Sequence, residues 1–222
     1  MANLDVLITG ANRGIGLALA RQLAARGDRV IATCRQESKE LGALGVRVET
    51  GVDVTSDASV QALMERLGQQ PLDLLILSAG ILRGDDLDGL RLQDVREQLE
   101  VNALGPLRVA QACRARLRRG GKIAVLTSRM GSMGDNGSGG YYGYRMSKAA
   151  LNALAVSLAR DLRVAGVSVA ILHPGYVRTD MTGNSGNVTP EQSARQLLER
   201  IDALTPERSG TFWHANGEVL PW

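Results

Sequence analysis

A tyrosine and a lysine lie four residues apart at the start of a predicted helix, in the segment Tyr144-Arg145-Met146-Ser147-Lys148. Residues four apart on a helix lie one above the other on the same face. An ammonium beside a phenol favours the phenolate, so Lys148 is expected to lower the pKa of Tyr144 from its reference value of about 10. The pair is therefore a candidate for acid/base chemistry near neutral pH, if the rest of the chain supplies a substrate site.

A glycine-rich segment follows the first predicted strand. Residues 4 to 9 form a short apolar run, and Gly10-Ala11-Asn12-Arg13-Gly14-Ile15-Gly16 then leads into residues 17 to 24, whose apolar positions have helical spacing. Strand, glycine-rich turn and helix is the context in which a helix N-terminus binds a pyrophosphate through its free N–H groups. The spacing differs from the usual Gly-x-Gly-x-x-Gly, so an ordinary strand-to-helix turn is the alternative interpretation.

The end of the second predicted strand, residues 29 to 33, indicates which nucleotide would bind. NAD sites of this kind carry an acidic residue there for the ribose hydroxyls. Here the strand runs into Cys34 and Arg35, and no carboxylate comes before Glu37. Because a guanidinium pairs well with a 2′-phosphate, Arg35 and Arg13 favour NADP(H). Two solvent-exposed arginines without a ligand are the alternative.

Strands and helices alternate along the sequence, which predicts an α/β fold with a parallel sheet covered on both faces in one domain. Further strands are expected at residues 46–49, 72–77, 122–127, 167–172 and 212–213. Helices are expected at residues 57–67, 90–117, 144–165 and 190–204. Gly105-Pro106 would kink the second of these helices, and Thr189 would cap the last.

The residues that follow the predicted strands gather at one edge of the sheet, because ligands of such a sheet bind beyond the carboxyl ends of its strands. These residues are Gly10, Arg35, Asp53, Ser78, Ala79, Gly80, Ser128, Pro174 and Gly175. Tyr144 begins the helix after Ser128 and falls at the same edge. A nucleotide, a hydroxyl and a tyrosine–lysine pair suffice for hydride transfer to or from a carbonyl carbon, with Tyr144 moving the proton of the oxygen.

Several motifs stand together in this chain: Thr9-Gly10-x-x-x-Gly14-Ile15-Gly16, Asn102, Ser128, Tyr144-x-x-x-Lys148 and Pro174-Gly175. In combination they resemble the short-chain dehydrogenase/reductase family. The resemblance implies a single-domain Rossmann fold (residues 1–222), doubly wound around a parallel sheet of about seven strands. It also implies a catalytic tetrad of Asn102, Ser128, Tyr144 and Lys148. In the family the lysine bonds the nicotinamide ribose, and the asparagine holds a water in a proton relay to the lysine.

The resemblance further implies which residues bind the cofactor. Asp53 would contact the adenine, and the segment from Pro174 to Thr179 would line the nicotinamide end. The full set of expected NADP(H)-binding residues is Gly10, Asn12, Arg13, Gly14, Ile15, Gly16, Arg35, Asp53, Val54, Ala79, Gly80, Tyr144, Lys148, Pro174, Gly175, Val177 and Thr179. Residues 137–145 and the ending Leu220-Pro221-Trp222 resemble the C-factor and sniffer-like carbonyl reductase branch, which is associated with NADP and carbonyl substrates.

Three features depart from the family pattern. Leu77-Ser78 stands where the family has Asn-Asn, so the asparagine contacts at that corner are lost or changed. Ser128 and Tyr144 are 16 residues apart, a few more than usual, and Ser132 is a fallback for the serine role. Tyr141 also has a basic residue four positions on, although that arginine matches the role less well than Lys148.

Composition and charge argue against several other classes. The formal net charge of +3 is too small to indicate nucleic-acid binding, and the basic run from Arg114 to Lys122 is interpreted as a solvated helix end. Cys34 and Cys113 have neither a disulfide framework nor metal spacing, so no metal is expected. His173 is interpreted as a hydrogen-bonded structural histidine, and His214 as non-catalytic. The lack of a long apolar run and of a signal-peptide pattern predicts a cytoplasmic protein that binds no membrane.

The leading hypothesis is an NADP(H)-dependent carbonyl reductase or alcohol dehydrogenase with a small-molecule substrate. The alternative is a catalytically weak signalling or regulatory protein of the same fold, which only Leu77-Ser78 favours. A nucleotide-sugar epimerase or dehydratase is disfavoured, because only about 40 residues follow Asp180. Specificity is expected to lie in residues 129–143 and 181–190. Residual apolar surface on the helices of residues 91–117 and 144–165 suggests a homodimer or homotetramer.

Overall fold

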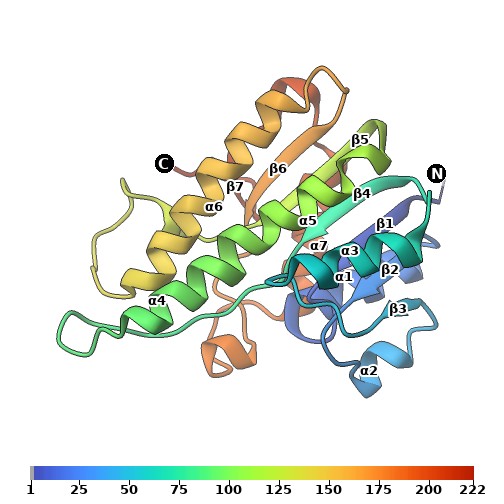
Figure 1. Cartoon of the computed structure of the whole chain (residues 1–222). Coiled ribbons are helices and arrows are strands. Elements are labelled where there is room, and N and C mark those ends of the chain that lie inside the picture. Colours follow the sequence, from blue (N-terminus) through green and yellow to red (C-terminus); the bar gives the residue numbers. More distant parts are fainter. Residues whose placement is uncertain (1–2) are drawn as a thin grey trace.

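A parallel sheet of seven strands forms the centre of the molecule, in the order β3-β2-β1-β4-β5-β6-β7 (Figure 1). The structure is a computed structural model that describes residues 3–222. The strands are β1 (Asp5–Thr9), β2 (Arg29–Thr33), β3 (Arg47–Glu49), β4 (Leu72–Leu77), β5 (Leu117–Leu126), β6 (Ser168–His173) and β7 (Phe212–His214). All neighbouring strands pair in parallel, so their carboxyl ends share one edge. The predicted α/β class and the strand number are confirmed.

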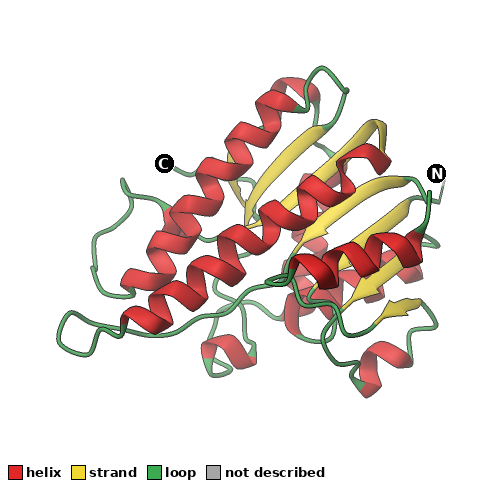
Figure 2. Cartoon of the chain, in the orientation of Figure 1, coloured by secondary structure: helices red, strands yellow, loops and turns green. Residues whose placement is uncertain are grey.

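Helices cover both faces of the sheet (Figure 2). They are α1 (Gly14–Ala25), α2 (Lys39–Gly42), α3 (Asp57–Leu67), α4 (Leu92–Leu99), α5 (Gly105–Cys113), α6 (Tyr142–Asp161) and α7 (Pro190–Asp202). Alternate strand residues serve the two sides: Leu7 and Ile31 join the core under α3, α5 and α6, whereas Val6 and Ile8 join the core under α1 and α7. Within residues 3–222, no helix combines the length and apolarity needed to cross a membrane.

The helix expected over residues 90–117 is interrupted and shorter. α4 passes into a π-helical turn at Glu100–Leu104, and α5 follows. The chain then enters β5 at Leu117, five residues earlier than the sequence predicts. The interpretation of the basic run as a helix end is therefore wrong for its second half, because Arg118 lies in β5. There its guanidinium pairs with Asp5 at 3.0 Å and with Asp73 at 2.6 Å.

The strand order reverses at β1, which pairs with β2 on one side and β4 on the other. This is the position at which open parallel sheets bind ligands. Gly10 follows β1 with φ of +67°, and a Cβ built on it would lie 2.8 Å from the Cα of Ala79 after β4. The ends of β1 and β4 are therefore in close backbone contact, which only glycine permits.

Candidate active site

A cavity of about 1180 Å³ opens at the carboxyl edge of the sheet, above β1 and β4. Its walls come from the glycine-rich loop, the ends of β2 and β4, the start of α6 and the segment after β6. The expected cofactor residues that line it are Gly10, Asn12, Arg13, Gly14, Ile15, Gly16, Arg35, Asp53, Val54, Ala79, Gly80, Tyr144, Lys148, Pro174 and Thr179. Gly175 and Val177 are not among the lining residues, and Val177 is buried.

The start of α1 faces this cavity and suits an anion. Arg13 precedes the helix without a capping side-chain hydrogen bond, and the first turn of α1 contains no acidic residue. A Cβ on Gly16 would overlap the carbonyl oxygen of Gly10, so the loop needs glycine there. The N–H groups at this helix end, together with the helix dipole, can therefore receive a phosphate.

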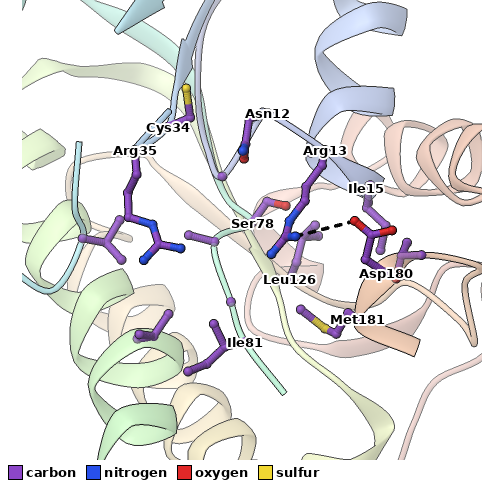
Figure 3. A pocket seen from close by; sticks show the side chains of 18 of the residues that line it. Asn12, Arg13, Ile15, Cys34, Arg35, Ser78, Ile81, Leu126, Asp180 and Met181 are labelled. Carbon is purple, nitrogen blue, oxygen red and sulfur yellow. Dashed lines mark ion pairs between the residues drawn. The ribbon is translucent and has the colours of Figure 1, made fainter. Parts of the chain in front are cut away.

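Arg13 and Arg35 reach toward the cavity from two sides (Figure 3). Arg13 forms an ion pair with Asp180 at 3.5 Å, and both side chains are largely exposed, so the pair is weak. The Asp53 carboxylate accepts hydrogen bonds from the amide and the hydroxyl of Thr55, at 2.9 and 2.8 Å, and these bonds lower its pKa. This part of the cavity thus combines the guanidiniums of Arg13 and Arg35 with the Asp53 carboxylate, whose lowered pKa keeps it ionised.

Tyr144 and Lys148 lie one turn apart in α6, and both line the cavity. The helix begins at Tyr142, two residues earlier than predicted. Tyr144 is 8% exposed and Lys148 is 5% exposed. The Lys148 ammonium lies 5.7 Å from the centroid of the tyrosine ring and donates a hydrogen bond to the Leu126 carbonyl at 3.0 Å.

Burial dominates the pKa values of this pair. It raises the pKa of Tyr144 to about 12, although a hydrogen bond with Ser128 acts in the opposite direction. It lowers the pKa of Lys148 to about 8. The expectation that Lys148 lowers the pKa of Tyr144 is therefore wrong, because the loss of water around the phenolate dominates and only Ser128 opposes it. Near neutral pH, Tyr144 is a neutral phenol beside a lysine that is mostly protonated.

Ser128 is the serine that acts on Tyr144, because its hydroxyl opposes the effect of burial on the pKa of the phenol. Its Oγ also accepts the N–H of Met130 at 3.1 Å. The fallback Ser132 is engaged within its own loop, where its Oγ accepts the N–H of Asp135. The other alternative, Tyr141, precedes α6 with its side chain 42% exposed; like Ser128, it is not among the residues that line the cavity.

Asn102 is completely buried in the π-helical turn. Its Oδ1 accepts the N–H of Ile81 at 2.8 Å, and its Nδ2 donates to the Ile81 carbonyl at 2.8 Å and to the Ser147 hydroxyl at 3.0 Å. Both amide hydrogens are therefore used within the protein. A water held by this side chain could bind only to the remaining lone pair of Oδ1.

Thr9 holds the backbone that follows β4, where Leu77-Ser78 stands in place of two asparagines. The Thr9 hydroxyl oxygen accepts the N–H groups of Ser78 and Ala79, at 3.0 and 3.2 Å. The backbone after β4 is thus tied to the end of β1 even though Leu77-Ser78 replaces Asn-Asn. No side-chain hydrogen bond is needed from Ser78 for this contact.

The two histidines form an edge-on pair, with ring centroids 4.9 Å apart. The Nδ1 atom of His173 is buried without a hydrogen-bond partner, so the expected hydrogen bond is wrong for this atom. Burial, with smaller contributions from His214, Arg129 and Lys148, lowers the pKa of His173 to about 3 and keeps the ring neutral. Among the described residues, no cluster of histidine, cysteine and acidic side chains is arranged to hold a metal.

Two polar residues of the site were missed by the sequence reasoning. Ser147 lies within the tyrosine–lysine motif, and its hydroxyl donates to the Tyr144 carbonyl at 2.8 Å. Its position three residues after Tyr144, on the same helical face, was the available signal. Asp180 pairs with Arg13 across the cavity mouth, and no sequence pattern connects two residues so far apart in the chain.

Comparisons with known proteins agree with this geometry. The family model for short chain dehydrogenases matches residues 5–190. A 1-hydroxy-2-glutathionyl-2-methyl-3-butene dehydrogenase of Rhodococcus sp. (strain AD45) is 47% identical over 223 residues, which cover 98% of this chain and 99% of that protein. The C-signal protein of Myxococcus xanthus is 44% identical over 155 residues, which cover 68% of this chain and 93% of that protein.

A solved structure of high similarity is that of an NADPH-bound carbonyl reductase from chicken fatty liver. It superposes with a TM-score of 0.89 at 32% identity, and the match covers 100% of both chains. The resemblance noted from the motifs, including the C-factor and carbonyl reductase branch, is thereby confirmed.

Proposed function

The chain belongs to the short-chain dehydrogenase family, and on this premise we propose that it is an NADP(H)-dependent carbonyl reductase, with Tyr144 as its general acid/base. As a member of that family it is an oxidoreductase. The observation that carries the finer proposal is the placement of Tyr144 and Lys148, both buried, in the same cavity as the start of α1 and two arginines. A nicotinamide bound in this cavity would lie in the same site as the proton donor Tyr144.

The residues of the cavity fit NADP(H). The start of α1 would bind the pyrophosphate, Asp53 would meet the adenosine, and Arg13 and Arg35 would pair with the 2′-phosphate. No carboxylate follows β2 within Thr33-Cys34-Arg35 to compete for that position. When bound, the nicotinamide supplies or takes the hydride. An NADPH-bound structure of a similar carbonyl reductase supports this choice of cofactor.

The proton is handled by Tyr144 and its neighbours. In the reducing direction the neutral phenol gives its proton to the substrate oxygen, and the Lys148 ammonium stabilises the phenolate that remains. The Ser128 oxygen already accepts the Met130 N–H, so its own hydrogen can be donated to the substrate oxygen. Asn102 would act by holding Ile81 and Ser147 in place.

The first test is a titration of the purified protein with NADPH and, separately, NADH, followed by nicotinamide fluorescence. We expect NADH to bind more weakly than NADPH by at least about tenfold, or about 1.4 kcal/mol. Arg35→Asp should narrow or reverse this preference, because it replaces the 2′-phosphate partner by a charge that repels it. Tyr144→Phe should bind NADPH normally and reduce carbonyl compounds at only a small residual rate.

Failure to bind either nucleotide would contradict the proposal. Normal NADPH binding without turnover of any carbonyl or alcohol would favour the alternative, a signalling protein that keeps the nucleotide site. The 44% identity to a protein named C-signal is the specific observation that favours this alternative function. Because of the 47% identity to a 1-hydroxy-2-glutathionyl-2-methyl-3-butene dehydrogenase, alcohols that carry a glutathionyl group are the first alcohols to test as substrates. Simple ketones and aldehydes are tested alongside them.

A further inference from the structure

The first turn of α6 lacks a capping side chain of its own. Tyr141 precedes the helix with a left-handed backbone, φ of 53°, and its side chain makes no capping hydrogen bond. The N–H groups at a helix start need acceptors. Here the acceptors come from Asp85, at the end of residues 81–85 in the connection from β4 to α4, a segment called the strap below.

Asp85 accepts hydrogen bonds from three consecutive amides. Its carboxylate oxygens accept the N–H of Tyr142 and, at 3.1 Å, the N–H of Gly143. Its backbone carbonyl accepts the N–H of Tyr141 at 2.8 Å. A carboxylate at a helix N-terminus gains from the helix dipole and from charge-assisted bonds. Tyr144 is the next residue in the helix, so its backbone begins where this cap ends.

The strap is itself held by buried side chains of the α4 segment. The Oε1 atom of Gln98 accepts the N–H of Arg83 at 2.8 Å, and Asn102 bonds both the N–H and the carbonyl of Ile81. Gln98 and Asn102 are completely buried and four residues apart, so they project from one face of their helix. The strap is thus fixed at every second residue, up to Asp85.

These bonds close a ring around Tyr144. Asn102, which bonds the strap at Ile81, donates to the Ser147 hydroxyl at 3.0 Å, and Ser147 donates to the Tyr144 carbonyl at 2.8 Å. On the other side, Asp85 holds the amide of Gly143, directly before Tyr144. The backbone of the tyrosine is therefore anchored both before and after its Cα.

We propose that Asp85 is a positioning residue for Tyr144: its carboxylate fixes the first turn of α6 and hence the place of the phenol hydroxyl in the cavity. This inference rests on the proposed function, in which that hydroxyl moves the proton. Asp85 is not among the cavity-lining residues, so it acts through the helix backbone. An uncapped first turn frays, and a small displacement of a reacting group slows the chemical step.

The test compares Asp85→Ala and Asp85→Asn with the matched control Asp86→Ala. Asp86 is the adjacent acid, is exposed, and accepts the N–H of Gly89 within its own loop. For each full-length variant, amide hydrogen exchange is measured in peptides covering residues 139–148. The kcat and KM for carbonyl reduction and the Kd for NADPH are measured on the same preparations. Turnover is expressed per NADPH-binding site, so any unfolded protein is excluded.

In Asp85→Ala, we expect exchange in residues 139–148 to accelerate at least tenfold and kcat to fall at least tenfold. The Kd for NADPH should stay within twofold, because Asp85 is not among the residues that line the cavity. Asp85→Asn keeps one acceptor and should be intermediate in both measurements. It also supplies the result if Asp85→Ala does not fold. Asp86→Ala should match the wild type.

Unchanged exchange in Asp85→Ala would overturn the proposal, and so would faster exchange with an unchanged kcat per site, because the cap would then be structural only. An equal effect of Asp86→Ala would overturn it as well. If the wild-type protein binds NADPH but reduces no carbonyl compound, the proposed function fails separately. The exchange comparison then decides alone whether Asp85 fixes the turn that carries Tyr144.

Discussion

Tyr144 and Lys148 are both buried, and burial moves their pKa values in opposite directions. The pKa of Tyr144 rises to about 12 and that of Lys148 falls to about 8. Burial therefore favours the neutral phenol over the phenolate. A neutral phenol beside a cation is suited to donate a proton, which is what the reduction of a carbonyl requires.

This arrangement predicts the pH dependence of carbonyl reduction. We expect kcat to be constant around neutral pH and to fall as the pH rises through about 8, where Lys148 loses its proton. The direction follows because the deprotonated amine no longer stabilises the phenolate that forms when Tyr144 gives up its proton. The measurement is kcat at saturating NADPH across the pH range in which the protein stays folded.

Tyr144→Phe serves as the control, since its residual rate should show no such step. A wild-type rate that stays level to well above pH 8 would contradict the role given to the Lys148 ammonium. A rate that rises with pH would indicate instead that a phenolate acts as a base.

At the residue scale, the sequence shows which residue types occur and how they are spaced, but not which segments pack around each side chain. The four-residue spacing of Tyr144 and Lys148 places both in the cavity, as expected. Their pKa values could not be foreseen, because burial depends on segments such as β5 and the Ser128 loop that pack around them. The Asp180 partner of Arg13 was missed for a similar reason, since only the folded chain brings the two loops together.

At the scale of elements, α6 and the α4 segment approach each other closely at Gly143. A Cβ on this residue would lie 2.5 Å from the Nε2 atom of Gln98 and 3.0 Å from the Cα of Val95. The second contact is with backbone, which cannot move away alone. The close approach of the two helices therefore requires glycine directly before Tyr144.

Gly143→Ala should destabilise the protein and displace Tyr144. Overpacking of this kind costs about 1–3 kcal/mol. We expect urea denaturation to show a loss in this range, accompanied by a lower kcat. Gly137→Ala is the control in the loop before α6, because a Cβ there meets no atom within 4 Å. Wild-type stability of Gly143→Ala would show that the helices can separate without cost.

Elements with a regular pattern were predicted with their observed bounds, and those shaped by distant contacts were not. β2, α3 and β4 begin and end where the sequence predicts, because their apolar periodicity and caps are local. The π-helical turn around Asn102 was not foreseen, since that side chain bonds Ile81 and Ser147 from other segments. The early start of β5 likewise reflects Arg118 and its carboxylate partners on β1 and β4.

At the scale of the whole molecule, large apolar side chains remain exposed on the helices beside the site. Leu104 lies on the π-helical turn, Leu107 on α5 and Met146 on α6. Their exposed fractions are 47%, 42% and 52%. Neighbouring helices that present apolar side chains favour pairing with a second copy of the chain. We propose that the protein is a homodimer or homotetramer through these helices.

Light scattering at micromolar concentration should then give a mass at least twice that of one chain. Leu107→Glu should yield monomers, because a buried carboxylate without a partner opposes the contact. Val164→Glu is the control, since Val164 is 87% exposed beyond the end of α6. A wild-type monomer would contradict the proposed assembly.

The strap also determines where the chain can change in length. Its bonds fall on Ile81, Arg83 and Asp85, so an inserted residue would break their register with Asn102, Gln98 and the first turn of α6. Residues 86–91 carry no comparable ties, and Leu87 is 71% exposed. Insertions and deletions among related chains should therefore begin after Asp85, which makes this aspartate the boundary between a segment of fixed length and one free to vary.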